Sequence, residues 1–71
     1  MTVKIGDILQ LYPNDGSGPV PGIVCKVWSD RDVNLAAWNQ YGTAFQAPHT
    51  PLLQAGEAPP STGAAYAVWP V

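Results

Sequence analysis

Proline and glycine recur so often along this chain that they leave little room for a helix. Eight Pro and seven Gly occur among 71 residues, and the longest stretch free of both runs from Ile23 to Tyr41. Even in this stretch the apolar positions lack the 3.6-residue period of an amphipathic helix, while β-branched and aromatic residues are common. The sequence therefore predicts an all-β fold.

Turn residues divide the chain into five short strands. A polar turn at 29–32 separates the second strand from the third, and Gly42 is expected to take the positive φ of the next hairpin. The predicted strands cover residues 8–12, 23–28, 33–38, 43–47 and 64–69. Five short strands with long Pro/Gly-rich loops are typical of a small SH3-like barrel. A length of 71 residues allows one such domain, residues 1–71.

The Pro-rich segment 48–63 is expected to be extended and irregular, apart from a short strand at 52–54. A long irregular segment in so small a domain is usually functional or disordered. Its prolines fix φ, so it would lose little entropy on binding. We therefore expect this segment to lie along a partner.

Alternation of side chains along each strand predicts the interior of the barrel. Lys26 and Asn34 mark the wetter faces of the second and third strands, which assigns the opposite faces to the core. The predicted inward residues are Leu11, Ile23, Cys25, Val27, Val33, Leu35, Phe45, Tyr66 and Val68, with either Ile8 or Leu9. The Trp residues then fall on the outward faces.

Charge and hydropathy exclude several classes of partner. Three Lys or Arg against five Asp or Glu give a net charge of -2. Three scattered cations form no phosphate-binding stripe, so nucleic-acid binding is not expected. No apolar run approaches the roughly 20 residues that span a bilayer, and the start lacks the apolar region of a signal peptide, so we expect an intracellular product without membrane contact. The low charged fraction of 11% favours association in a homo-oligomer or multi-copy assembly.

The inventory of reactive side chains is thin. A single Cys forms no internal disulfide, and one Cys with one His cannot complete a zinc site. Only His49 could activate Cys25 as a nucleophile, so we expect Cys25 to be a buried structural residue and His49 a solvent-facing loop residue. Turn formation accounts for Asp30 and Asp32, and the run 14–18 lacks the remaining ligands of a calcium or phosphate loop. We therefore expect no enzymatic activity, no cofactor and no metal.

Five large rings at strand ends or turns are the best candidates for a binding function. Rings left on outward faces form apolar patches of the kind that mark interfaces. The sequence leaves equally open that the Trp side chains complete a core too small to be filled otherwise. The predicted partner-binding residues are Tyr12, Trp28, Trp38, Tyr41 and Trp69.

Several short motifs, spread over most of the chain, resemble a group of short tailed-phage and prophage proteins. They are the Gly6-Asp7 opening, Pro21-Gly22-Ile23-Val24, Val33-Asn34-Leu35 leading into Asn39-Gln40-Tyr41-Gly42, and the closing Val68-Trp69-Pro70. Where that group closes with a Trp-x-Trp-Pro-like motif, this chain has Ala67 at the first Trp position. The resemblance implies a phage origin and an SH3-like barrel, and it carries over no site residue.

Taken with the low charge and the outward rings, this resemblance predicts a phage virion accessory protein. We expect a capsid decoration or minor capsid protein that is assembled in the host cytoplasm and binds the major capsid protein or another virion protein. The alternative is a soluble early phage protein that acts as a binding module for a host protein or a small signalling molecule. The two hypotheses differ in whether the chain is part of the particle.

Overall fold

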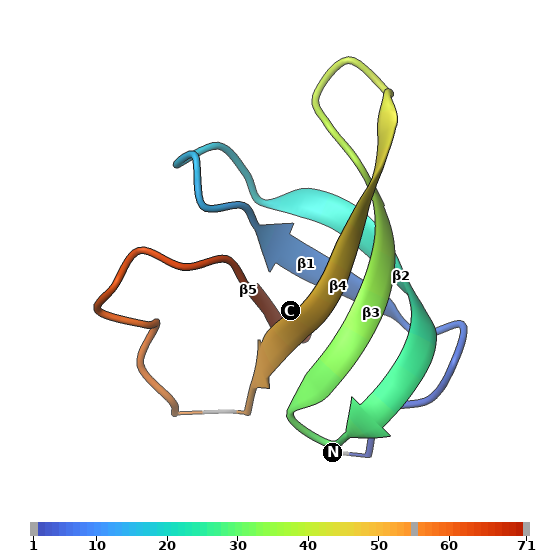
Figure 1. Cartoon of the computed structure of the whole chain (residues 1–71), viewed down its shortest axis with the longest axis vertical. Helices are drawn as coiled ribbons and strands as arrows, with labels where there is room; N and C mark the ends of the chain where they lie inside the picture. The colour runs from blue at the N-terminus through green and yellow to red at the C-terminus, as the bar shows by residue number, and fades with distance from the viewer. Residues whose placement is uncertain (1, 55, 71) are drawn as a thin grey trace.

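Five strands close into a barrel in the order in which they occur along the chain (Figure 1). This computed structural model describes residues 2–54 and 56–70, so residues 1, 55 and 71 of the predicted domain lie outside the described residues. The strands are β1 (Ile8–Tyr12), β2 (Val20–Ser29), β3 (Asp32–Trp38), β4 (Ala44–Leu53) and β5 (Tyr66–Val68). The architecture confirms the predicted all-β, five-stranded barrel, and its size is consistent with the SH3-like kind.

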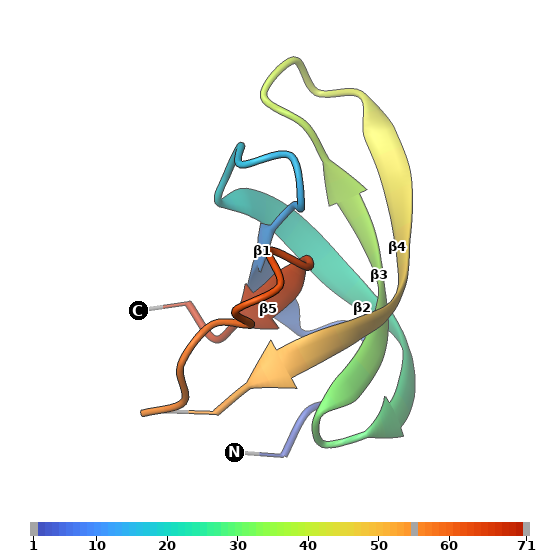
Figure 2. The ribbon, with the colours of Figure 1, turned by 60° about the vertical axis from the view of Figure 1, so that its left-hand side comes forward.

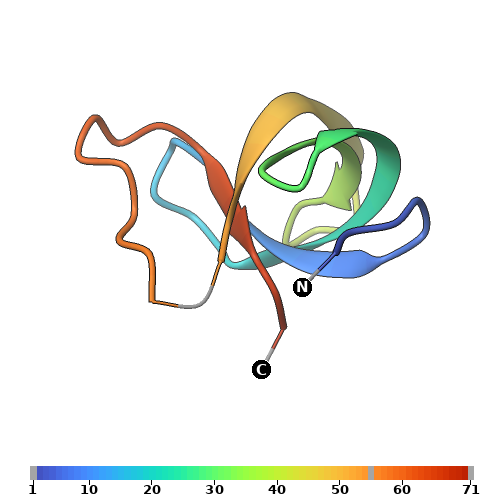
Figure 3. The same cartoon turned by 90° about the horizontal axis from the view of Figure 1, so that it is seen from below.

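Neighbouring strands are antiparallel except at the point of closure. The pairs β1–β2, β2–β3, β3–β4 and β1–β5 are antiparallel, whereas β4 and β5 run parallel. The long strands β2, β3 and β4 curve together, and β1 and β5 lie on the other side of the barrel (Figure 2). The connection between β4 and β5 swings out to one side (Figure 3). The three residues of β5 therefore join the two edges of the sheet.

Proline lies inside β4, which is longer than the sequence predicts. The expectation of an irregular segment is wrong for residues 48–51, which belong to β4, while Leu52 and Leu53 of the predicted short strand at 52–54 are its last two residues. Pro48 falls at a register shift between the Val33 and Leu35 pairs of β3 and β4. A strand tolerates proline at a bulge because the ladder of hydrogen bonds is already interrupted there.

Small and medium aliphatic side chains fill the interior. Leu9, not Ile8, is the inward residue at the start of β1, and the prediction that Leu11, Val33 and Leu35 face inward is confirmed. The buried hydrophobic residues are Val3, Leu9, Leu11, Val20, Val24, Val33, Leu35, Ala37, Leu52 and Ala67. All five strands contribute to this set, so a single core spans the barrel.

The predicted inward face of β2 is wrong at its centre. Val24 is buried, whereas Ile23 and Cys25 are exposed. A register shift between Val24 and Lys26 places an extra residue in β2 opposite β3, and strict alternation fails across such a bulge. Val27 packs against the core three positions after Val24. Strict alternation about the exposed Lys26 predicts that Cys25 faces the core, but Cys25 lies at the surface.

The predicted face of β5 is also inverted. Ala67 is fully buried, and Tyr66 and Val68 are only partly buried. Ala67 pairs with Leu11 of β1 on one side and with Leu52 of β4 on the other. Since two buried leucines flank this position, a methyl group fits where a larger side chain would crowd the closure.

The start of the β4–β5 connection is tied to the β2–β3 turn. Arg31 in that turn forms an ion pair with Glu57, and the Gln54 side chain donates a hydrogen bond of 3.1 Å to the Asp30 carbonyl. The Glu57 carboxylate also accepts the backbone N–H of Gln54 at 2.6 Å. The Arg31 hydrogen bond, followed by that of Gln54, lowers the pKa of Glu57.

Replacing Leu9 with Ala should lower the free energy of unfolding by about 2–5 kcal/mol, because it leaves a cavity in the core. Ile8→Ala, at the adjacent position of the same strand, should lower it by less than about 1 kcal/mol, because Ile8 is 61% exposed. Urea denaturation followed by circular dichroism measures both. Equal effects of the two changes would contradict the face assigned to β1.

Replacing Arg31 with Gln should raise the pKa of Glu57 toward the ordinary glutamate range. The folded-state pKa of Glu57 is lowered. The ion pair with Arg31 therefore stabilises the connection fully at pH values above the ordinary glutamate pKa, and this stabilisation is lost as the pH falls through the lowered pKa. An NMR titration of the Glu57 side-chain carboxyl carbon measures the shift. Lys4→Gln is the matched control and should leave the Glu57 pKa unchanged.

Candidate functional site

An uncharged row of side chains crosses the outside of four strands. Ile8 of β1 pairs with Ile23 of β2, Ile23 with Ala36 of β3, and Ala36 with Gln46 of β4. Ile8 and Ile23 are 61% and 37% exposed, and Ile5, just before β1, is 69% exposed. We call the surface formed by Ile8, Ile23, Ala36 and Gln46 the outer face.

A hollow adjoins the outer face and shares Ala36 and Gln46 with it. Its volume is about 260 Å³, and Cys25, Asn34 and Pro48 also line it. The bulge that turns Cys25 outward also places its thiol in the wall of this hollow, where Cys25 donates a weak hydrogen bond to the Ile23 carbonyl. The outer face therefore combines protruding isoleucines with an indentation.

One asparagine holds two rings together beyond the hollow. The side-chain oxygen of Asn34 accepts hydrogen bonds from Trp28 Nε1 at 2.9 Å and from the backbone N–H of His49 at 2.8 Å. The indole and imidazole stack with centroids 4.8 Å apart and planes 17° from parallel. Lys26 Nζ lies 5.0 Å from the centroid of the indole ring, within the range of a cation–π contact. The cluster around Asn34 therefore fixes Trp28 although the indole is 51% exposed.

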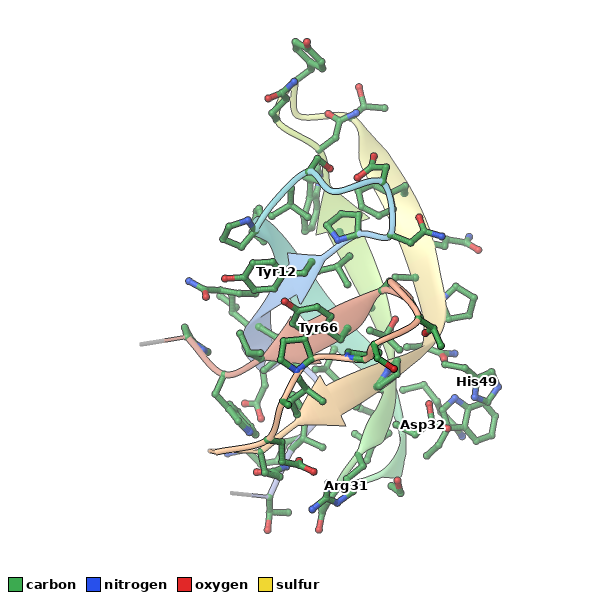
Figure 4. All side chains as sticks on the ribbon, turned by 90° about the vertical axis from the view of Figure 1, so that its left-hand side faces the viewer. Tyr12, Arg31, Asp32, His49 and Tyr66 are labelled. Carbon is green, nitrogen blue, oxygen red and sulfur yellow. The ribbon has the colours of Figure 1, made fainter. Side chains whose placement is uncertain are left out.

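Asp32 orients the histidine of this cluster. His49 Nδ1 lies 3.2 Å from Asp32 Oδ2 (Figure 4), which leaves the far side of the imidazole to the solvent. His49 has a φ of 48°, and it is the one non-glycine residue with positive φ in the described part of the chain. Such backbone conformations are costly and persist where the surrounding contacts hold them. The second carboxylate oxygen of Asp32, Oδ1, is buried without a hydrogen-bond partner.

The Asp32–His49 pair lies apart from any nucleophile bonded to it in the described residues. An Asp–His pair can orient a general base, but a nucleophile must lie within hydrogen-bond reach of that base. None of the hydrogen bonds among residues 2–54 and 56–70 joins a hydroxyl or thiol to the His49 ring. In the same residues, no group of three His, Cys, Asp or Glu side chains is placed to hold a metal ion. His49 is in β4, not in the loop that the sequence predicts.

The five predicted partner-binding rings lie in different surroundings. Trp28 belongs to the Asn34 cluster, and Tyr41, at 83% exposed, lies in the turn between β3 and β4. Tyr12 is half-buried and stacks on Tyr66 at 4.9 Å (Figure 4). The half-buried residues Trp38 and Trp69 complete the set.

Only part of the aromatic prediction has the geometry of an exposed anchor. Tyr41 is mostly exposed and Trp28 is about half exposed, whereas Trp69 packs against the core and its Nε1 is buried without a partner. Trp69 therefore fits the alternative in which an indole completes a small core. Sequence reasoning missed Ile8 and Ile23 as surface residues, because it counted both as candidates for the interior. A bulge in β2 has no clear sequence signal, so the exposure of Ile23 was not visible in the pattern, and the sequence left open whether Ile8 or Leu9 faces inward.

Comparison with known proteins identifies no relative. Scans of family models, of curated proteins and of solved structures return no match to this chain. The likeness to short tailed-phage proteins thus rests on sequence motifs alone and stays a prediction. No helix able to cross a membrane occurs in the described ranges.

Replacing Asn34 with Ala should lower the free energy of unfolding by about 1–2 kcal/mol, because it removes the acceptor of two hydrogen bonds. The same change should release Trp28, so the NMR signal of its indole N–H should move toward that of an exposed, unpaired indole. The matched control is Asn14→Ala, in the exposed loop between β1 and β2. An unchanged indole signal in Asn34→Ala would contradict the role of Asn34 as the centre of the cluster.

Proposed function

We propose that this chain is a non-catalytic binding module that docks onto a larger protein through its outer face. The observation that carries the proposal is the uncharged row from Ile8 to Gln46, to which the chain adds the exposed Ile5 just before β1. Covering one large aliphatic side chain is worth about 1–2 kcal/mol. Three exposed isoleucines on so small a chain are therefore a substantial driving force for association.

The shape of the outer face supports a protein partner over a small molecule. Pockets for small ligands usually enclose about 300–1,000 Å³, and the hollow beside Ala36 measures about 260 Å³. It is large enough to receive a side chain from a partner, while Ile8 and Ile23 contact the partner's surface. Trp28, fixed by Asn34 and His49, extends the same side of the barrel as a rigid aromatic anchor.

We place this partner in a phage particle, with the chain as a capsid decoration or minor capsid protein on the major capsid protein. The sequence motifs shared with short tailed-phage proteins support this choice of partner. The low charge supports it too, since 8 charged residues in 71 protect a free subunit poorly against association. A subunit that binds a repeating shell gains stability from each contact.

Mass spectrometry of purified particles should find this chain in a fixed ratio to the major capsid protein. The double variant Ile8→Glu, Ile23→Glu should be depleted from particles by about tenfold or more, because two charges would be desolvated in the contact. Its circular dichroism spectrum should match that of the unmodified protein, since both side chains are exposed. Thr62→Glu, exposed in the β4–β5 connection, is the matched control and should be incorporated normally.

Two outcomes would contradict the proposal in different ways. Absence of the chain from purified particles, with a stable complex formed with one host protein, would support the alternative of a soluble anti-host binding module. Normal incorporation of the double variant would instead show that the isoleucines are not the docking surface.

A further inference from the structure

A second surface feature lies at the end of the barrel where the β1–β2 loop faces the β3–β4 turn (Figure 1). Two hollows of about 390 and 380 Å³ lie between these segments. Both are lined by Asp15, Ser17, Val20 and Asn39, so they adjoin and form one groove. We call it the loop groove. It shares no lining residue with the outer face.

The wall formed by the β1–β2 loop is pre-organised around Asp15. One oxygen of this carboxylate, Oδ1, accepts both the backbone N–H of Ser17 at 2.8 Å and its hydroxyl at 2.6 Å. These bonds, the side-chain one first, lower the pKa of Asp15, so the carboxylate stays charged. The loop closes tightly at Gly18, where an added Cβ would lie 2.8 Å from Pro13 Cδ. Asp15 therefore holds its negative charge in a fixed place, with its second oxygen outside these bonds.

The opposite wall is a turn that holds Tyr41 in the open. Asn39 Oδ1 accepts the backbone N–H groups of Tyr41 at 2.9 Å and Thr43 at 3.0 Å. The Gly42 N–H donates to the Asn39 carbonyl, and Gly42 has the predicted positive φ, 82°. The turn is thus internally bonded, yet the Tyr41 side chain is 83% exposed. A fixed ring loses little further freedom when it contacts a ligand.

Charge distinguishes the two hollows from the outer face. Asp15 is the one charged residue that lines the loop groove, and no Lys, Arg or His lines it. Tyr41 lines the hollow nearer the turn, where a cation can contact both a carboxylate and an aromatic ring. Pro13 and the half-buried Phe45 line the other hollow, which is suited to an aliphatic side chain. The groove is complementary to a ligand that is cationic at one end and apolar at the other.

We propose that the loop groove binds an extended basic segment of a partner protein, with an Arg or Lys side chain between Asp15 and Tyr41 and an aliphatic side chain against Phe45. An extended chain directs the side chains of residues i and i+2 to the same side, about 7 Å apart. Two adjoining hollows of similar volume can each receive one of these two side chains. This contact goes beyond docking through the outer face, and its test involves neither the isoleucines nor a phage particle.

The test is an NMR titration of the full chain with the peptide acetyl-Ala-Arg-Ser-Leu-Ala-amide. Backbone signals of Ser17, Asn39 and Tyr41 should shift together as the peptide saturates the groove. Asp15→Asn should weaken binding by about fivefold, because the charge is lost while the amide oxygen can still accept the Ser17 bonds. Tyr41→Ala should weaken it by about threefold, because the ring contact is lost.

Matched controls separate this site from general attraction to a negatively charged protein. Asp30→Asn removes a charge from the exposed β2–β3 turn and should leave the affinity unchanged. The analogue with Glu in place of Arg should not bind. No shifts at millimolar peptide, equal binding of the Glu analogue, or shifts centred outside the groove would each overturn the proposal. Equal binding by acetyl-arginine amide alone would overturn the extended segment as the ligand.

Discussion

The small interior of the barrel determines where every large apolar side chain lies. The buried hydrophobic residues are all Val, Leu or Ala, and Leu is the largest that is fully enclosed. Closure at β5 is the tightest point, since Ala67 contacts both edges of the sheet through its pairs with Leu11 and Leu52. The described Trp and Tyr residues are all partly or mostly exposed. The barrel therefore has an apolar surface because its core fully encloses none of the described aromatic rings or isoleucines, although Phe45 and Trp69 pack against it.

Register shifts give that surface its shape. Two lie in the β2–β3 pair, between Val24 and Lys26 and between Val27 and Ser29, and a third lies in the β3–β4 pair on either side of Asn34. Bulges re-aim side chains and bend the strand that carries them. Asn34 lies opposite Lys26 in the first pair and is skipped in the second, so its side chain can reach residues of β2 and β4 at once. The stacked rings of Trp28 and His49 follow from this position.

The sequence predicts the class of fold and the number of strands because both depend on local signals. Pro and Gly positions, β-branched runs and the Gly42 turn are each visible without knowledge of the partner strand. The faces of β2 and β5 are not predictable in this way, because a bulge and a closure contact are properties of pairs of strands. The same reason hides residues 48–51 of β4, where Pro48 lies at a register shift opposite Asn34.

The candidate site is also predictable only where local sequence signals suffice. Trp28 and Tyr41 were identified from their types and positions, and both are exposed. The contacts that fix Trp28 are not visible in the sequence, because Asn34 and His49 are separated by 15 positions in the chain. His49 also adopts a left-handed backbone conformation, with positive φ, that no local residue pattern predicts.

Two separate contact surfaces would give this small chain a defined orientation on its partner. The outer face is uncharged and provides apolar surface for a contact, whereas the loop groove carries a single fixed charge from Asp15. An apolar contact alone is weakly directional, because the hydrophobic effect depends on area and not on angle. A charged side chain held between Asp15 and Tyr41 restricts rotation about that contact and selects partners with a basic residue at the matching distance. Since both contacts would be made by one rigid barrel, the second forms at a high effective concentration once the first is in place.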